Sequence, residues 1–198
     1  MHQNPTASAT RKLAHTRQIV CTGYVRDDGL YDIEARMTDT KGHDSALLFK
    51  DVPRGSPIHD MRFTITIDAH LVIRAAHAHT ESAPTPWCSQ INEAYAKLAG
   101  IAIGSGFMKE VKARLGGALG CTHLTELLGP MATTAFQTIM GLQEGAHTSL
   151  AAAAQREGKP LLPMLDACHA WRVDGEVVHA LRERAGEPAA RARVSADV

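Results

Sequence analysis

Residues 61–68 read MRFTITID, and this stretch decides the fold class. Apolar and polar side chains alternate through it, the apolar ones being Met61, Phe63, Ile65 and Ile67. Successive side chains of a strand point to opposite faces, so the pattern predicts a strand with one buried face. A turn at residues 68–70 follows, and LVIRAAHAH (71–79) is expected to return as its antiparallel partner.

A second hairpin is expected earlier in the chain. RQIVCTGYV (17–25) is rich in β-branched residues, and Asp27-Asp28-Gly29 after it is a turn signal, because Asp bonds its own backbone and Gly accepts positive φ. Beyond the turn, one face of the chain is apolar and the other charged, with Tyr31, Ile33, Ala35 and Met37 on the apolar face. This alternation predicts a half-buried strand, followed by a polar connection over residues 40–57.

Helical patterns dominate the second half. The prolines of APTPW (83–87) end the sheet, and Ser89 is a candidate cap for the first helix. A second helix is predicted over residues 107–115, and a third near Thr122, where Pro130 should kink or split it. DGEVV (174–178) is expected to form a weak short strand. The predicted class is α+β, a small antiparallel sheet of about four strands packed against three or more helices. The apolar stripe of the third helix comprises Leu124, Leu128, Met131, Ala135 and Ile139.

Length and charge bound the function. A chain of 198 residues predicts one domain, over residues 15–182, between a mobile leader (1–14) and a mobile tail (183–198). Lys plus Arg equals Asp plus Glu, so nothing favours nucleic acid or an anionic membrane as a partner. The start of the chain has no signal-like apolar region, and we expect a soluble cytoplasmic protein with reduced cysteines. The sequence leaves a homo-oligomer open.

One set of residues suits a metal ion. Asp60, Cys88, Cys121 and His123 each lie at a predicted element boundary, and a cysteine at a helix start gains thiolate character from the helix dipole. One Asp, two Cys and one His would suit a single zinc or iron ion. The alternative is that both cysteines are small buried hydrophobic residues.

Other polar residues are candidates for substrate contact or proton transfer. Arg26 could hold a carboxylate, and Asp32 or Glu34 could act as a general base, although composition alone favours a polar hairpin with a charged outer face. His59 is a candidate base beside Asp60. Neighbouring residues on a strand point to opposite faces, so only one of these two is expected at any one site.

Several of these motifs occur together, in order, in a known family. HTR (15–17), RDDGLYDIEARMTDTK (26–41), HDM (59–61), GCTHLTELL (120–128) and DACHAWRVDGEVV (166–178) resemble the family known as domain of unknown function 2889. The resemblance covers about residues 15–179. Its members are bacterial and often occur in catabolic settings, but the family supplies no activity to carry over.

The order of elements is also similar to the iron–sulfur cluster assembly scaffolds of the NifU type. That resemblance implies a scaffold-like fold in which Asp60, Cys88 and Cys121 match metal ligands. His59 and His123 depart from the scaffold pattern, which favours a single metal ion over a cluster. We therefore expect a metal-dependent enzyme acting on a small organic acid or aromatic catabolite. The alternative is a non-enzymatic metal or iron–sulfur carrier that works with a protein partner.

Overall fold

The computed structural model describes residues 9–142, 166 and 168–186. The chain divides into two compact units, Met1–Ile139 and Met140–Val198. The single domain expected over residues 15–182 stays a prediction. Most of the predicted leader (residues 1–8) and tail (187–198) lie outside the described residues, as does the segment 143–165.

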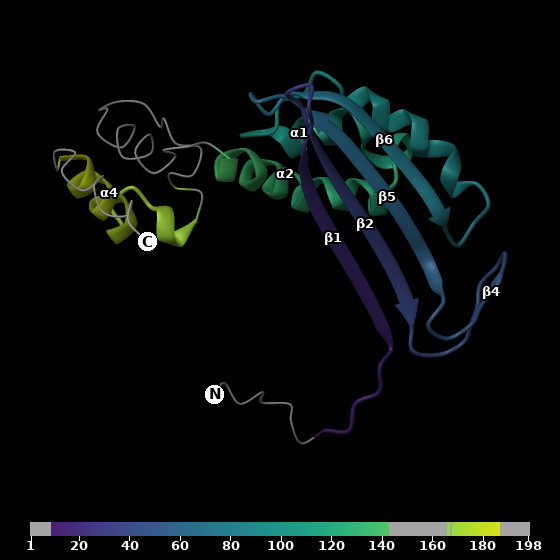
Figure 1. Ribbon diagram of the computed structural model, residues 1–198. Coiled ribbons are helices and arrows are strands. Elements are labelled where there is room, and N and C mark those ends of the chain that lie inside the picture. The colour runs from purple at the N-terminus through teal and green to yellow at the C-terminus, as the bar shows by residue number, and fades with distance from the viewer. Residues whose placement is uncertain (1–8, 143–165, 167, 187–198) are drawn as a thin grey trace, which may run out of the picture. The chain divides into compact units, whose positions relative to one another are not determined.

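The first unit is built on a four-stranded antiparallel sheet of order β1-β2-β5-β6 (Figure 1). Its strands are β1 (His15–Val25), β2 (Tyr31–Lys41), β5 (Pro57–Ile67) and β6 (Ile73–Ser82). Both predicted hairpins are confirmed, and Gly29 adopts the positive φ of 81° that its turn requires. The expected polar connection also contains two short paired strands, β3 (Ser45–Ala46) and β4 (Asp51–Val52).

Helices cover one face of this sheet, in agreement with the predicted α+β class (Figure 1). They are the 3₁₀ helix η1 (Cys88–Leu98), α1 (Phe107–Leu115), the short η2 (Gly117–Leu119) and α2 (Thr122–Leu142). The predicted stripe of α2 is buried from Leu124 to Ile139. Each leucine, isoleucine or methionine of this stripe stabilises the fold by about 1.5–3 kcal/mol. The ring of Phe63 in the sheet packs edge to face on that of Tyr95 in η1, with the ring centroids 5.1 Å apart.

Pro130 was expected to kink or split the third helix; α2 continues through it as one helix, so it is not split, and a kink stays a prediction. One expectation is corrected. The DGEVV segment is not a strand: Glu176 begins α4 (Glu176–Gly186) of the second unit, where Val178 is fully buried. A helix is favoured here because Glu176 places a negative charge in the first turn, where the helix dipole is positive. The second unit also contains the short η3 (His169–Trp171).

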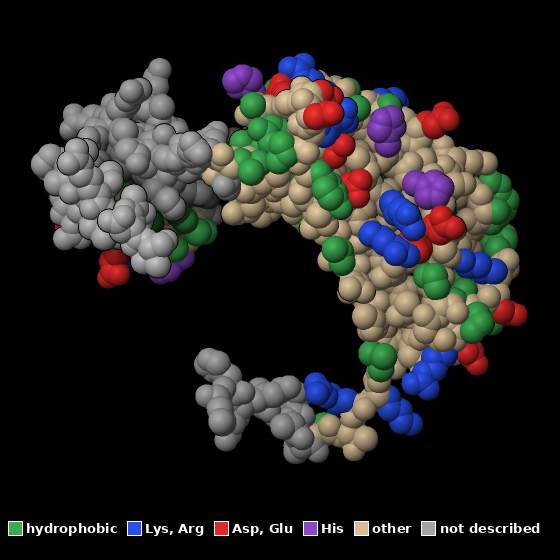
Figure 2. All heavy atoms as spheres, in the orientation of Figure 1, with side chains coloured by type: hydrophobic (Ala, Val, Ile, Leu, Met, Phe, Trp, Pro, Cys, Tyr) green, Lys and Arg blue, Asp and Glu red, His purple; other side chains and the backbone are tan. Residues whose placement is uncertain are grey.

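The opposite face of the sheet is polar. Alternation places even-numbered residues of β1, β2 and β5 on this open face, while odd-numbered residues face the helices. Basic, acidic and histidine side chains gather over β5 and β6 on this face (Figure 2). No helix among the described residues has both the length and the apolar character needed to cross a membrane.

Candidate functional site

A row of polar side chains interrupts the apolar, helix-facing side of the sheet near one end. Arg17 of β1 lies directly opposite Asp39 of β2, and Asp39 lies opposite His59 of β5. All three residues have odd numbers, and the odd-numbered residues of these strands face the core, as Ile33, Ala35 and Met37 of β2 do. The core pattern therefore places these side chains beneath α2.

Asp39 is the centre of the row. The residue is 1% exposed, and four contacts reach its carboxylate. Arg17 donates from Nε to Oδ1 at 2.8 Å and from a terminal nitrogen to Oδ2 at 2.7 Å, which is the bidentate geometry that guanidinium and carboxylate favour. His59 Nδ1 lies 2.9 Å from Oδ2, and His15 Nε2 lies 3.2 Å from Oδ1. A buried carboxylate is tolerated here because Oδ1 has one hydrogen-bond partner and Oδ2 has two, with His15 close to Oδ1.

These contacts keep Asp39 ionised. Burial alone would raise the pKa of Asp39, but the hydrogen bond and charge of Arg17, aided by His59, outweigh it and lower the pKa to about 2. An ionised carboxylate accepts only, so His59 must carry its proton on Nδ1 and donate to Asp39. The Nε2 lone pair of His59 is then available for a proton or a metal ion.

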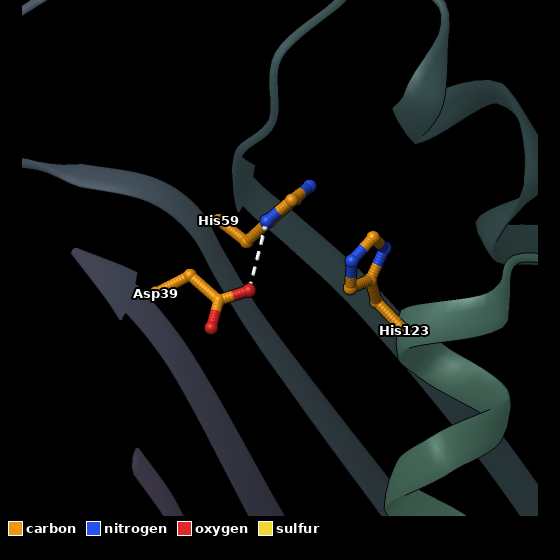
Figure 3. Close-up of side chains that lie close together, drawn as sticks. All are labelled: Asp39, His59 and His123. Carbon is orange, nitrogen blue, oxygen red and sulfur yellow. Dashed lines mark hydrogen bonds and ion pairs between the residues drawn. The ribbon is translucent and has the colours of Figure 1, made fainter. Parts of the chain in front are cut away.

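His123 reaches the row from the first turn of α2. Its ring stacks on that of His59 with centroids 3.9 Å apart and planes inclined by 32° (Figure 3). Burial lowers the pKa of His59 below 6.5, and the neighbouring His123 lowers it further, against the opposing effect of Asp39. His59 is therefore neutral at pH 7, with its Nε2 lone pair free.

Buried contacts hold the start of α2 in place. Tyr95, fully buried, donates its hydroxyl to the carbonyl oxygen of Cys121 at 2.8 Å and accepts from the Cys121 N–H at 2.9 Å. Near the surface, Arg17 also donates to Glu126, one turn after His123, at 2.5 Å. The helix that carries His123 is thus tied to both the core and the polar row.

One group of three side chains could hold a metal ion among the described residues. Asp39, His59 and His123 each offer one ligand atom, and these three atoms lie within 4.8 Å of one another. Two imidazole nitrogens and a carboxylate oxygen suit zinc and iron. Figure 3 shows these side chains converging from β2, β5 and α2.

The structure brings only part of the predicted ligand set to this place. His123 lies in the cluster, whereas Asp60 lies on the open face of the sheet, where Arg36 holds its carboxylate at 2.8 and 2.6 Å. Cys88 contacts the Thr85 hydroxyl at 3.1 Å, and the half-buried Cys121 packs against the core. In the part of the chain that the structure describes, these four residues do not form a ligand cluster.

The predicted catalytic residues also divide between the two faces. His59 lies in the cluster, and Asp60 faces away from it, as the alternation of a strand requires. Arg26 pairs with Asp28 at 2.7 Å beside the hairpin turn and with Asp32 at 3.3 Å. Glu34 and Asp32 both lie on the open face, so neither can act on a molecule bound at His59.

Asp39 was missed by reasoning from the sequence, and so were the roles of His15, Arg17 and Glu126. The available signal was the odd-numbered spacing of Asp39 after Ile33, Ala35 and Met37. A carboxylate on the buried face of a strand needs a cationic partner, which the register supplies at Arg17.

A comparison with known protein families confirms the family that the sequence motifs resemble. A family model described as protein of unknown function (DUF2889) matches residues 15–137, and the chain belongs to that family. No curated protein and no solved structure matches the chain. The likeness to NifU-type scaffolds therefore stays a prediction. Four separate motifs of the family resemblance meet at one place, since they supply His15 and Arg17, Asp39, His59, and His123 and Glu126.

Proposed function

We propose that this protein is a metal-dependent enzyme in which His59, His123 and Asp39 hold one zinc or iron ion. The observation that carries the proposal is the proximity of three ligand atoms, all within 4.8 Å of one another. Their protonation states also suit a cation, because Asp39 is ionised and His59 is neutral at pH 7. Three protein ligands leave coordination positions for water and a substrate.

Metal binding requires two local changes. The lone pair of an imidazole lies in its ring plane, and rings stacked at 3.9 Å do not aim at one point, so the ring of His123 must turn about its side-chain bonds. The hydrogen bond from His59 Nδ1 to Asp39 must also break, because the two nitrogens of an imidazole point away from one another and an ion on Nε2 would otherwise lie on the far side of the ring from Asp39. This change can leave the bidentate pair of Asp39 with Arg17 intact.

The ligand types favour a single ion over an iron–sulfur cluster. Clusters are held mainly by thiolates, and Cys88 and Cys121 are not part of the group of three. A zinc or iron ion with open positions can polarise a carbonyl or activate water, which is the chemistry that a small organic acid or aromatic catabolite would need. These ligand types therefore favour an enzyme with a single metal ion over an iron–sulfur cluster carrier.

Metal titration of the untagged chain tests the proposal. After removal of metals with a chelator, we expect one equivalent of zinc to bind, followed by calorimetry, and one of cobalt(II), followed by its absorption spectrum. His59→Gln and His123→Gln should each weaken binding by about 10–100-fold or more. His79→Gln is the matched control, because His79 is 63% exposed on the other face of the sheet and should leave binding unchanged. Binding unaffected by either cluster variant would overturn the proposal.

A second candidate is acid–base catalysis without a metal. It is favoured by the hydrogen bonds already in place, because Asp39 orients His59 through Nδ1 at 2.9 Å and leaves Nε2 as the proton acceptor. The same titration separates the two. Absence of metal binding, together with a His59 pKa below its ordinary value, would favour the acid–base site.

A further inference from the structure

A row of basic side chains crosses the open face of the sheet. Arg36 of β2 lies directly opposite Arg62 of β5, and Arg62 lies opposite His79 of β6. Like charges directly opposite on neighbouring strands destabilise a sheet. The buried carboxylate of Asp60 offsets part of this charge, but only Arg36 is hydrogen-bonded to it.

A solvent-open hollow of about 560 Å³ lies beside this row. Three neighbouring strands, β1, β2 and β5, form its floor. It combines cationic, anionic, hydroxyl and apolar groups in one place, namely Arg36, Arg62, Glu34, Thr22, Thr64 and Val20. Ligand sites combine apolar contact with a few polar groups that fix the orientation of the ligand, and this hollow offers both.

The charges around the hollow are not all used within the sheet. The buried carboxylate of Asp60 fixes the guanidinium of Arg36 at two contacts, although the Arg36 side chain remains 52% exposed. Arg62 and Glu34 form no hydrogen bond or ion pair with any side chain that the structure describes. One guanidinium and one carboxylate, on neighbouring strands, thus face the same hollow.

We propose that this hollow binds a small organic acid that carries a hydroxyl or ammonium group close to its carboxylate. Arg62 would bind the carboxylate through two parallel N–H donors, and the held guanidinium of Arg36 would add positive charge beside it. Glu34 would accept a hydrogen bond from the ligand's hydroxyl or ammonium group. Thr22 and Thr64 can donate to the carboxylate, and Val20 can contact the carbon chain. The site lies on the opposite face of the sheet from His59, so it is independent of the proposed metal site.

NMR titration of the ¹⁵N-labelled full chain tests this inference. Lactate, acetate and inorganic phosphate are added separately at one ionic strength. We expect lactate to shift the amide signals of β2 and β5 around the hollow, and to bind more tightly than either acetate or phosphate. Arg62→Gln should weaken lactate binding at least tenfold, and Glu34→Gln should remove the preference for lactate over acetate.

Arg74→Gln is the matched control, since Arg74 is an exposed arginine of the neighbouring strand that pairs with Asp68. It should leave lactate binding unchanged. The thermal midpoint of Arg62→Gln should fall less than that of Arg36→Gln, because Arg62 acts on Asp60 through its charge alone, whereas Arg36 also donates two hydrogen bonds. The inference is overturned if no acid shifts these signals, if phosphate binds more tightly than lactate, if Arg74→Gln weakens binding as much as Arg62→Gln, or if Arg62→Gln unfolds at a lower temperature than Arg36→Gln.

Discussion

Replacing Arg17 with Gln should destabilise the protein in a pH-dependent way. Arg17 is the main partner of Asp39, whose pKa lies at about 2 instead of 3.8. A difference of nearly two pKa units corresponds to about 2.4 kcal/mol of folding free energy. Removal of one partner from a fully buried ion pair costs about 3–5 kcal/mol, but Arg17 is 32% exposed and both histidines remain. We therefore expect Arg17→Gln to lower the free energy of unfolding by about 2–3 kcal/mol at pH 7.

The pH dependence identifies the cause. A carboxylate with a lowered pKa stabilises the folded state fully above 3.8, and this contribution is lost as the pH falls towards 2. The difference between wild type and Arg17→Gln should therefore stay constant from pH 7 to about 4 and shrink as the pH falls from there towards 2. Urea unfolding followed by circular dichroism at each pH measures it. Arg26→Gln is the control, because the Arg26 pairs are exposed to solvent and should contribute much less than the pair of Arg17 with Asp39. A cost for Arg17→Gln below about 0.5 kcal/mol, or one independent of pH, would refute this account of Asp39.

Two further changes test the neighbourhood of the row. Tyr95→Phe leaves the backbone of Cys121 without its hydroxyl partner and should lower the free energy of unfolding by about 1–3 kcal/mol, measured by urea unfolding; an unchanged value would contradict the role of the hydroxyl. His59 should titrate below 6.5 by NMR in the wild type, and its pKa should rise in His123→Gln, because the variant removes a neighbouring charge. An unchanged or lower pKa in that variant would show that the two rings are not coupled.

The sheet could be predicted because alternation is a local property of the sequence. Met61 to Ile67 and Ile33 to Met37 each show period two, and the turn at Gly29 joins the latter segment to the β-branched run at residues 17–25. The helix at residues 107–115 was predicted with the bounds that the structure has. Pro130 was harder, since the effect of a proline on a helix depends on how strongly the flanking turns are packed, and Leu127, Leu128 and Met131 are fully buried.

The candidate site depends on register, which alternation does not provide. His59 and His123 were predicted as functional residues, but their meeting with Asp39 requires β2 to pair with β5 at one particular offset and α2 to begin above that pair. Asp60 was favoured as a ligand because it begins the best strand. A shift of one residue moves a side chain to the other face, where Arg36 and not a metal ion meets it.

The central claim is that His59, His123 and Asp39 bind one metal ion. Anomalous diffraction at the zinc edge, from crystals of the full chain grown with zinc, tests it most directly. We predict one strong peak at about 2.0–2.2 Å from His59 Nε2, a His123 ring nitrogen and an Asp39 oxygen, with the ring of His123 turned out of its stack. A peak between Cys88 and Cys121, or no peak beside His59 in zinc-saturated crystals, would contradict the claim.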